Sequence, residues 1–490
     1  MFGNASPTRR ALAAVAFALI SPTAGAQEAA GVLRRSAAAM SAADLKSIRY
    51  TAEGAGYSFG QAFKPGLAWP KITVHSQVRT INYDTASMRH EITLSRAEPL
   101  GGGGYPLAGT QRSDQLVSGT HAWNQIGPAP ISAARSVGDR THQLWITPHG
   151  VVKAAMKNGA TLRWRTVAGK SLAAVSFTEP GLYAATAFIN DDYLVERVES
   201  RVPDAVLGEI EVVTRYSEYR DVGGLKFPAR IEQSAGGHPV LELTVKEVQP
   251  NVPADFPVPD LVRAATERVS AEKLADGVWF IVGGTHHSVA LEMKDHIVRV
   301  EAPLDDTRMA PVIEQVKQLA PGKPIAYVIN THNHFDHSGG LRAAAAEGAT
   351  IITHADNVPY FERAFAAHSK LKADRLTMSG RKAKFKAAGD KLVHGDGIRT
   401  IEIHRVANSV HADTFLMVVL PKERLLIEAD AYTPGAPNAP PPEVPNANNV
   451  NLIENIERLK LDVDRIVPIH GRVVPLTELY TTAKARPPAR

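Results

Sequence analysis

Short segments of alternating polar and apolar residues run from about residue 50 to residue 249 of the chain. Alternation with a period of two is typical of strands that bury one face, and the breaks containing glycine and proline between them are typical of turns. We therefore predict a twisted, mostly antiparallel sheet, preceded by an amphipathic helix at Val32–Leu45. The expected strands are Lys71–Asn82, Arg89–Arg96, Thr161–Thr166, Leu172–Phe177, Tyr193–Ser200, Glu209–Tyr219, Ala229–Gln233 and Val240–Val248.

The pattern changes after the proline-rich linker Pro250–Pro259. Short apolar runs come first, and apolar runs then alternate with segments of helical spacing. Hairpins followed by strand–helix units predict an α+β arrangement in which two sheets pack between helices. We expect a β-rich domain at residues 27–255 and a second domain at residues 265–490. The expected strands are Leu274–Val282, Ser288–Met293, His296–Glu301, Ile325–Ile329, Thr350–Thr353, Ile401–Val406, Phe415–Leu420 and Leu425–Ile427, and the expected helices are Met309–Leu319, Leu341–Glu347, Pro359–His368 and Leu452–Leu461.

The first residues have the features of an exported protein. Met1–Ala26 combines a short positive region, an apolar core at Ala11–Ile20 and small residues before Gln27. This combination predicts a secretory signal peptide, too short to span a membrane, and therefore a periplasmic or secreted protein. Arg9 and Arg10 are compatible with twin-arginine export, and ordinary unfolded export is an equal alternative.

Composition excludes several other classes. The chain has no cysteine, which excludes disulfides, thiolate zinc ligands and a lipid anchor on an N-terminal cysteine. The formal charge of +5 is spread along the chain without blocks of one sign, so it gives no case for a nucleic-acid partner. No other apolar stretch is long enough to span a bilayer, and we expect no stable membrane insertion.

The segment Thr331–Gly340 carries the densest chemistry of the chain, and it follows an apolar run typical of a buried strand. Residues of an extended segment alternate sides, so His332 and His334 point the same way and can grip one metal ion. Asp336 and His337, beyond the turn, can then face a second ion. Imidazole and carboxylate are ligands that suit zinc, and also iron or manganese.

Three more potential ligands follow strand-like runs further along the chain, where loops commonly build sites. They are His411, Asp430 and His470. With these residues, the order HxHxDH, His, Asp, His resembles the metallo-β-lactamase superfamily over roughly residues 270–490.

The resemblance implies a C-terminal αββα sandwich with two zinc ions at one edge. One ion would be held by His332, His334 and His411, the other by Asp336, His337 and His470, with Asp430 bridging them. It further implies a hydrolase in which a hydroxide between the ions attacks an electrophilic centre.

Further residues are candidates for roles other than metal binding. Asp336 is expected to shuttle a proton as well as bind metal, and Tyr432 is a candidate to stabilise an oxyanion. His286 and His287, in a loop that the resemblance places over the metals, are candidate substrate contacts. Glu301 either supports a ligand or caps a turn, and we expect the turn cap.

The substrate class is narrowed by Asp430. By the resemblance, true zinc β-lactamases usually have cysteine or serine at this position, so a small-molecule ester, lactone, thioester or lactam is the expected substrate. Two alternatives stay open: a redox di-iron protein on the same fold, and a non-catalytic periplasmic binding or transport protein.

The N-terminal half contains no comparable motif of metal ligands. Its segment Tyr216–Pro228 is similar to a strand–turn–strand signature of curved-sheet periplasmic lipoprotein carriers, and such a sheet can hold an apolar ligand or roof the metal site. Its histidines have no ligand spacing, so surface or turn roles are expected for His75, His90, His121, His142, His149 and His238.

Overall fold

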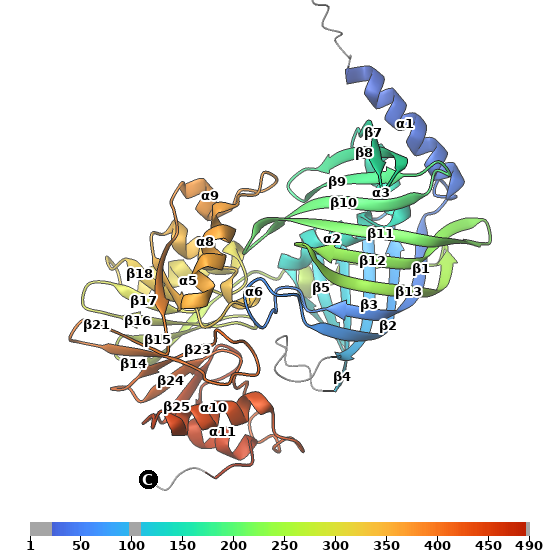
Figure 1. The fold of residues 1–490 in the computed structure, drawn as a ribbon. Coiled ribbons are helices and arrows are strands. Elements are labelled where there is room, and N and C mark those ends of the chain that lie inside the picture. Colours follow the sequence, from blue (N-terminus) through green and yellow to red (C-terminus); the bar gives the residue numbers. More distant parts are fainter. Residues whose placement is uncertain (1–21, 98–108, 487–490) are drawn as a thin grey trace, which may run out of the picture.

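The computed structural model describes residues 22–97 and 109–486, which form two halves joined side by side (Figure 1). Most of the predicted signal peptide, residues 1–21, lies outside the described residues. Among the described helices, none is long and apolar enough to cross a membrane.

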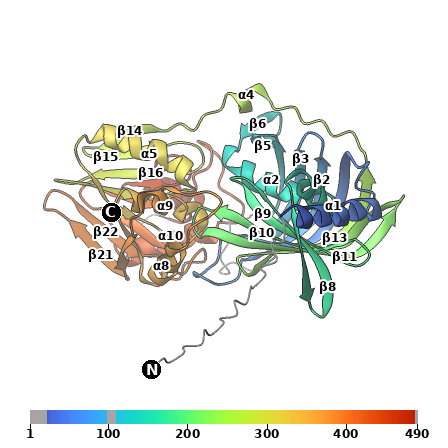
Figure 2. The ribbon, with the colours of Figure 1, turned by 90° about the horizontal axis from the view of Figure 1, so that it is seen from above.

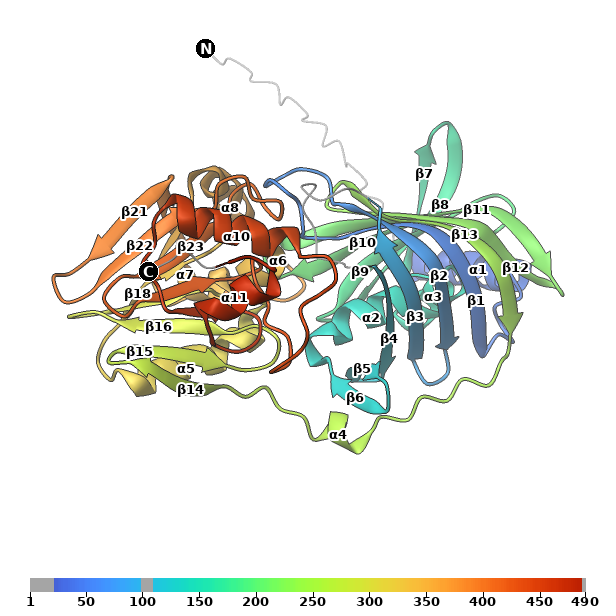
Figure 3. The ribbon, with the colours of Figure 1, turned by 90° about the horizontal axis from the view of Figure 1, so that it is seen from below.

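The N-terminal half is built on one curved sheet of 13 antiparallel strands, with β1 paired to both β2 and β13 (Figure 3). The predicted antiparallel β-rich domain is therefore present. The strands are β1 (Ser47–Tyr57), β2 (Lys71–Asn82), β3 (Ser87–Arg96), β4 (Thr110–Ser118), β5 (His121–Ile126), β6 (Ala129–Ser132), β7 (Thr161–Val167), β8 (Lys170–Glu179), β9 (Tyr183–Ile189), β10 (Val195–Asp204), β11 (Gly208–Val222), β12 (Leu225–Ala235) and β13 (His238–Pro250).

Helices pack on one face of this sheet and bury its apolar residues. They are α1 (Pro22–Ala39), the 3₁₀ turn η1 (Ala134–Ser136), α2 (Val137–Trp145) and α3 (Pro148–Lys157). The prediction of a helix at Val32–Leu45 is wrong at both ends. Helix α1 stops at Ala39 because Ser41 adopts a left-handed conformation (φ 53°) and Ala42 N donates to Ala37 O, which is a typical C-terminal cap.

Half of the N-terminal histidines are buried, so the expectation of surface roles is wrong for them. His142 accepts or donates a hydrogen bond at 2.7 Å to the Ser200 hydroxyl, and His149 bonds to the Met40 carbonyl at 3.2 Å. Burial lowers the pKa of His142 to about 3 and that of His149 to about 4. His90 is buried as well and contributes to a cavity described below.

The C-terminal half consists of two facing sheets between helices, which is the predicted αββα layering (Figures 1 and 3). The seven-stranded sheet contains β14 (Ser270–Ala275), β15 (Val278–Val282), β16 (Ser288–Glu292), β17 (Ile297–Val300), β18 (Ile325–Ile329), β19 (Thr350–His354) and β20 (Lys384–Ala388). The six-stranded sheet contains β21 (Lys391–Gly395), β22 (Thr400–Arg405), β23 (Leu416–Leu420), β24 (Leu425–Glu428), β25 (Arg465–Pro468) and β26 (Val474–Pro475).

The helices of this half are α5 (Asp306–Leu319), α6 (Phe335–Ser338), α7 (Leu341–Ala346), the 3₁₀ turn η2 (Ala355–Asn357), α8 (Val358–Ala366), α9 (Arg375–Ser379), α10 (Ala447–Arg458) and α11 (Leu476–Thr482). The short helix α4 (Asp260–Arg263) belongs to the segment between the halves and packs against β5 and β6 of the N-terminal sheet. Two apolar cores hold the layers of the C-terminal half together. One joins residues of both sheets with α10 and α11, and the other lies between the seven-stranded sheet and α5, α7 and α8.

Two local predictions for this half need correction. The expected strand Leu274–Val282 is a hairpin of β14 and β15, because Gly277 turns the chain with a left-handed φ of 67°. The expected helix Leu452–Leu461 begins earlier, at Ala447, where the side chain of Asn446 caps it by accepting from Asn448 N.

The halves are connected twice. The chain passes from β13 to β14 through a long segment containing α4 (Figure 2). In addition, residues 58–70, which link β1 to β2, reach across to the C-terminal half, where Gly60 O accepts from Phe335 N at 3.0 Å and Phe63 O accepts from Asp413 N at 2.9 Å. This bridging segment places the N-terminal half directly beside α6.

Candidate metal centre

Segments that follow strand ends of both sheets meet at one edge of the C-terminal half. The chain after β18 runs into the single-turn helix α6, and the loops after β22, β24 and β25 come to the same edge, together with the hairpin loop between β15 and β16. Each loop follows the carboxyl end of a strand or a hairpin, so side chains distant in sequence converge there. The converging side chains are His286, His332, His334, Asp336, His337, His411, Asp430 and His470.

These side chains form two groups, each able to hold a metal ion. The first group is His332, His334, His411 and Asp430, and the second is His286, Asp336, His337 and His470. The seven side chains that the sequence predicts as ligands converge in these two groups, in the predicted division. His286, expected only as a weak substrate contact, lies in the second group instead.

Asp430 lies between the two groups. Its Oδ2 is 2.8 Å from His411 Nε2 and 3.2 Å from His332 Nε2 of the first group, and 3.1 Å from His337 Nε2 of the second. Its Oδ1 is 3.0 Å from His470 Nε2. The Asp430 carboxylate thus faces imidazoles of both groups.

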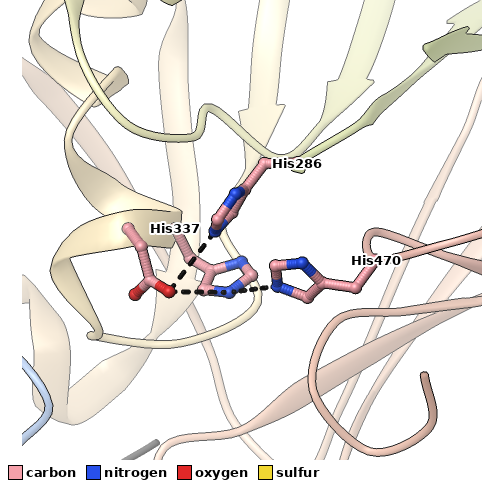
Figure 4. Close-up of side chains that lie close together, drawn as sticks. His286, His337 and His470 are labelled. Carbon is pink, nitrogen blue, oxygen red and sulfur yellow. Dashed lines mark hydrogen bonds and ion pairs between the residues drawn. The ribbon is translucent and has the colours of Figure 1, made fainter. Parts of the chain in front are cut away.

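In the second group, the imidazoles of His286, His337 and His470 lie close together (Figure 4), and Asp336 belongs to the same group. Asp336 Oδ2 lies 3.4 Å from His286 Nε2 and 3.7 Å from His337 Nε2, and the Nε2 atoms of His337 and His470 are 3.2 Å apart. The three histidines of this group therefore direct their Nε2 atoms, and not their Nδ1 atoms, toward the centre of the group.

The C-terminal half is similar to known proteins. Residues 306–470 match the family model described as metallo-beta-lactamase superfamily. The C-terminal region is a metallo-β-lactamase superfamily domain. It carries an additional N-terminal antiparallel sheet domain, and no curated protein matches the chain.

Solved structures similar to the chain include three metallo-β-lactamases. That of Pontibacter korlensis is 16% identical over 44% of this chain and 98% of its own, with a TM-score of 0.34. That of Hirschia baltica is 19% identical over 44% and 97%, with a TM-score of 0.32. FIM-1 of Pseudomonas aeruginosa in its mono-zinc form is 18% identical over 44% and 94%, with a TM-score of 0.32.

The donors of the superfamily domain fit divalent metal ions. Both nitrogens of His334 are buried and lack a hydrogen-bond partner among the described residues, an arrangement that costs about 1–3 kcal/mol if nothing binds there. The Nε2 atoms of His332 and His411 face each other at 3.2 Å. Imidazole and carboxylate donors in two groups are consistent with a dinuclear site for zinc, iron or manganese.

A metal ligand must be a neutral imidazole or a carboxylate, and the pKa values of His332, His334 and Asp430 favour these forms. Burial lowers the pKa of His332 to about 4 and that of His334 well below its ordinary value. His337 differs: burial works to lower its pKa, but Asp430, Asp336 and Glu301 together raise it well above the ordinary value. Burial likewise acts to raise the pKa of Asp430, and the neighbouring imidazoles, His337 first, hold it below its usual range.

In the second group, the outer nitrogen of each imidazole is held by a hydrogen bond. Glu301, fully buried, accepts from His337 Nδ1 at 2.8 Å and from Thr331 N at 2.7 Å. The expectation that Glu301 merely caps a turn is therefore wrong, because its carboxylate orients a ligand of the second group. His470 Nδ1 bonds to Thr285 O at 2.8 Å, and Thr285 Oγ1 bonds to His286 Nδ1 at 2.8 Å. Such contacts fix the ring orientation that metal binding needs.

Tyr432 and His287, which the sequence suggested as an oxyanion stabiliser and a substrate contact, lie outside both groups. The Tyr432 side chain is buried, and its hydroxyl lies 3.1 Å from Thr482 Oγ1 and 3.4 Å from Glu478 Oε1 on α11. It therefore packs against α11, and the oxyanion role is not supported. His287 accepts from Gly283 N at 3.2 Å and packs edge-on against Phe280, outside both groups.

The sequence reasoning missed one residue of the N-terminal half. Gln61, in the segment that joins β1 to β2, donates from Nε2 to Asp336 Oδ1 at 2.7 Å. Close by, Asn333 Nδ2 donates to Ala62 O at 2.8 Å, and Phe59 packs edge-on against Phe335. The one local signal was the length of this loop, since long loops in compact domains are usually functional.

Proposed function

We propose that the chain is a dinuclear, zinc-dependent hydrolase. The observation that carries the proposal is Asp430, whose two oxygens lie within 3.2 Å of four imidazole nitrogens drawn from both groups. A structural zinc site needs four ligands in a closed shell, whereas eight inward-turned donors exceed that need.

The side chains of the two groups would bind two metal ions. His332, His334 and His411 would hold one ion, Asp336, His337 and His470 the other, and Asp430 would bridge them. His286 adds an eighth donor on the side of the second ion. Two divalent ions bound there would supply Lewis acidity and lower the pKa of a water toward neutrality.

Asp336 is the residue that we propose to move a proton. Its Oδ1 is held by Gln61 at 2.7 Å, which leaves Oδ2 beside His286 and His337. A carboxylate fixed at one oxygen presents the other in a constant direction, which is what proton transfer to a leaving group requires. Gln61 would thus be a positioning residue supplied by the N-terminal half.

For the substrate we propose a small ester, lactone, thioester or lactam. The aspartate at position 430, where β-lactamases of the superfamily usually have cysteine or serine, favours the first three. We propose further that the protein acts after export, in the periplasm or outside the cell, as the character of Met1–Ala26 suggests.

The test is metal analysis of the purified full chain together with turnover of a panel of esters, lactones, thioesters and β-lactams. The wild type is expected to hold about two zinc ions per chain and to hydrolyse one class of the panel. Asp430→Ala is expected to lose metal and activity together. Asp356→Ala, an exposed carboxylate in the same domain, is the matched control and is expected to retain both.

Three results would contradict the proposal. Iron in place of zinc with no hydrolysis would favour a redox di-iron protein. A full metal complement without turnover of any substrate class would favour a binding protein. Wild-type metal content in Asp430→Ala would show that the carboxylate does not bridge.

A further inference from the structure

A cavity of about 790 Å³ lies on the curved sheet of the N-terminal half, apart from the eight metal-site side chains. Its walls come from β1, β2, β3 and β10–β13, with α2 on one side and residues of the C-terminal half, Thr307 and Lys372, on another. Cavities of roughly 300–1,000 Å³ are typical of sites for small molecules. Most of its wall is apolar, formed by residues such as Ile72, Val74, Ile92, Leu182, Ile210 and Val212.

One region of the cavity is polar, and its polar groups are incompletely paired. Gln77 is fully buried, and neither atom of its amide has a hydrogen-bond partner among the described residues. Arg79 Nε and His90 Nε2, on the neighbouring positions of β2 and β3, are likewise buried and unpartnered within the described part of the chain. Burying such groups costs about 1–3 kcal/mol each, so a fold that keeps them gains from a ligand.

The alternation of β2 explains why these side chains face inward. Val74 and Ile81 are buried on the same face, and a register irregularity between Val74 and Ser76 brings Gln77 and Arg79 onto it. On α2, Gln143 accepts from Arg79 Nη2 at 2.6 Å and donates to Asp139 Oδ2 at 3.1 Å. The strand pair and the helix thus hold one continuous polar cluster.

One charged group of this cluster is buried. The guanidinium of Arg79 is buried, its Nη2 is held by Gln143, and its Nε has no partner among the described residues. Asp139, which Gln143 joins to Arg79, is exposed, so the positive charge of Arg79 lies beside the unpartnered Gln77 amide on the buried side of the cluster. A buried positive charge favours an anionic partner that can accept hydrogen bonds.

We propose that this cavity binds an amphiphile with an elongated apolar body and one carboxylate head, the head lying against Gln77, Arg79 and His90. The apolar body lies along the walls formed by β10–β13. The proposal is independent of the hydrolase assignment, because none of the eight metal-site side chains lines the cavity.

The experiment is a fluorescence titration of the full chain with cis-parinaric acid, a fluorescent fatty acid, followed by displacement with palmitate and with 1-hexadecanol. We expect saturable binding of one molecule per chain, with palmitate displacing the probe at least about tenfold better than the alcohol, since a charge-assisted contact is lost in the alcohol.

Three variants locate the site. Gln77→Leu is expected to weaken binding about tenfold and, because it removes a buried amide without partners, to raise the melting temperature by a few degrees. Val212→Trp fills the cavity and is expected to abolish binding. Glu211→Trp, the adjacent and exposed position of β11, places the same side chain on the opposite face and is expected to bind like the wild type.

The outcomes are decisive in either direction. Absence of saturable binding, or equal affinity in the wild type, Gln77→Leu and Val212→Trp, would overturn the proposal. Equal displacement by palmitate and 1-hexadecanol would overturn the carboxylate head. Gln77→Leu keeps the test valid even where Val212→Trp fails to fold.

Discussion

The carboxylate of Glu301 offers the sharpest test of how this metal centre is supported. It is fully buried, and it accepts from His337 Nδ1 at 2.8 Å and from Thr331 N at 2.7 Å. In Glu301→Gln the backbone and side-chain volume are kept, including the left-handed φ of 71°. A glutamine has only one acceptor oxygen for these two donors, so one donor would face the NH₂ group of the amide.

The expected magnitude follows from these contacts. A hydrogen bond to a charged group contributes about 1.5–3 kcal/mol, so we expect Glu301→Gln to lower the free energy of unfolding by about 2–3 kcal/mol. For a domain of this size that corresponds to a fall in melting temperature of about 5–10 °C. Loss of such an orienting contact typically also weakens metal binding about 10–100-fold.

The assay has two readouts that do not depend on the substrate. Thermal unfolding of the metal-free full chain measures stability, and zinc competition against a chromophoric chelator measures affinity. Glu314→Gln, an exposed position of α5 whose carboxylate accepts from Gln318 Nε2, is the matched control and is expected to change both by little. Unaltered zinc affinity in Glu301→Gln would refute the argument that Glu301 orients His337.

Three further predictions concern the N-terminal half. Gln61→Ala should lower kcat by about 10–100-fold because Asp336 loses its positioning hydrogen bond, and unchanged kcat with Gln61→Ala would remove the residue from the mechanism. Gly60→Ala should lower the melting temperature, because Gly60 has a φ of 79° and an added Cβ would lie 2.7 Å from the Phe335 ring; a melting temperature like that of the wild type would contradict the close contact. Because the folded pKa of His149 is depressed to about 4, its stabilising effect is present above about pH 6.5 and is lost as the pH falls toward 4, at up to about 1.4 kcal/mol per pH unit. His149→Phe, which keeps the stacking on Phe227, should therefore shift the acid unfolding midpoint to lower pH, and an unmoved midpoint would contradict this assignment.

Much of the metal centre was predictable because it depends on local order in the sequence. The spacing of His332, His334, Asp336 and His337 after an apolar strand places the four side chains on one short segment. Strand periodicity likewise predicted Lys71–Asn82 with the bounds that β2 has in the structure. These features follow from the geometry of a few consecutive residues, so the sequence by itself determines them.

Other features depended on which distant segments pack together. His286 joins the second group because the β15–β16 hairpin closes over α6, and Gln61 reaches Asp336 from another domain, 275 positions away in the chain. Tyr432 turns toward α11 and away from the groups, although it stands two residues after Asp430.

The buried polar cluster around Gln77 and His90 was also predictable only in part. The alternating pattern predicted the strands, and the irregularity beside Ser76, together with the packing of α2, decided which polar side chains they bury. Hydrophobic periodicity specifies a buried face for each element, and it carries no information about the partner that covers that face. The partners were decided by the tertiary structure, because long-range packing and the closing of loops between distant segments bring them together.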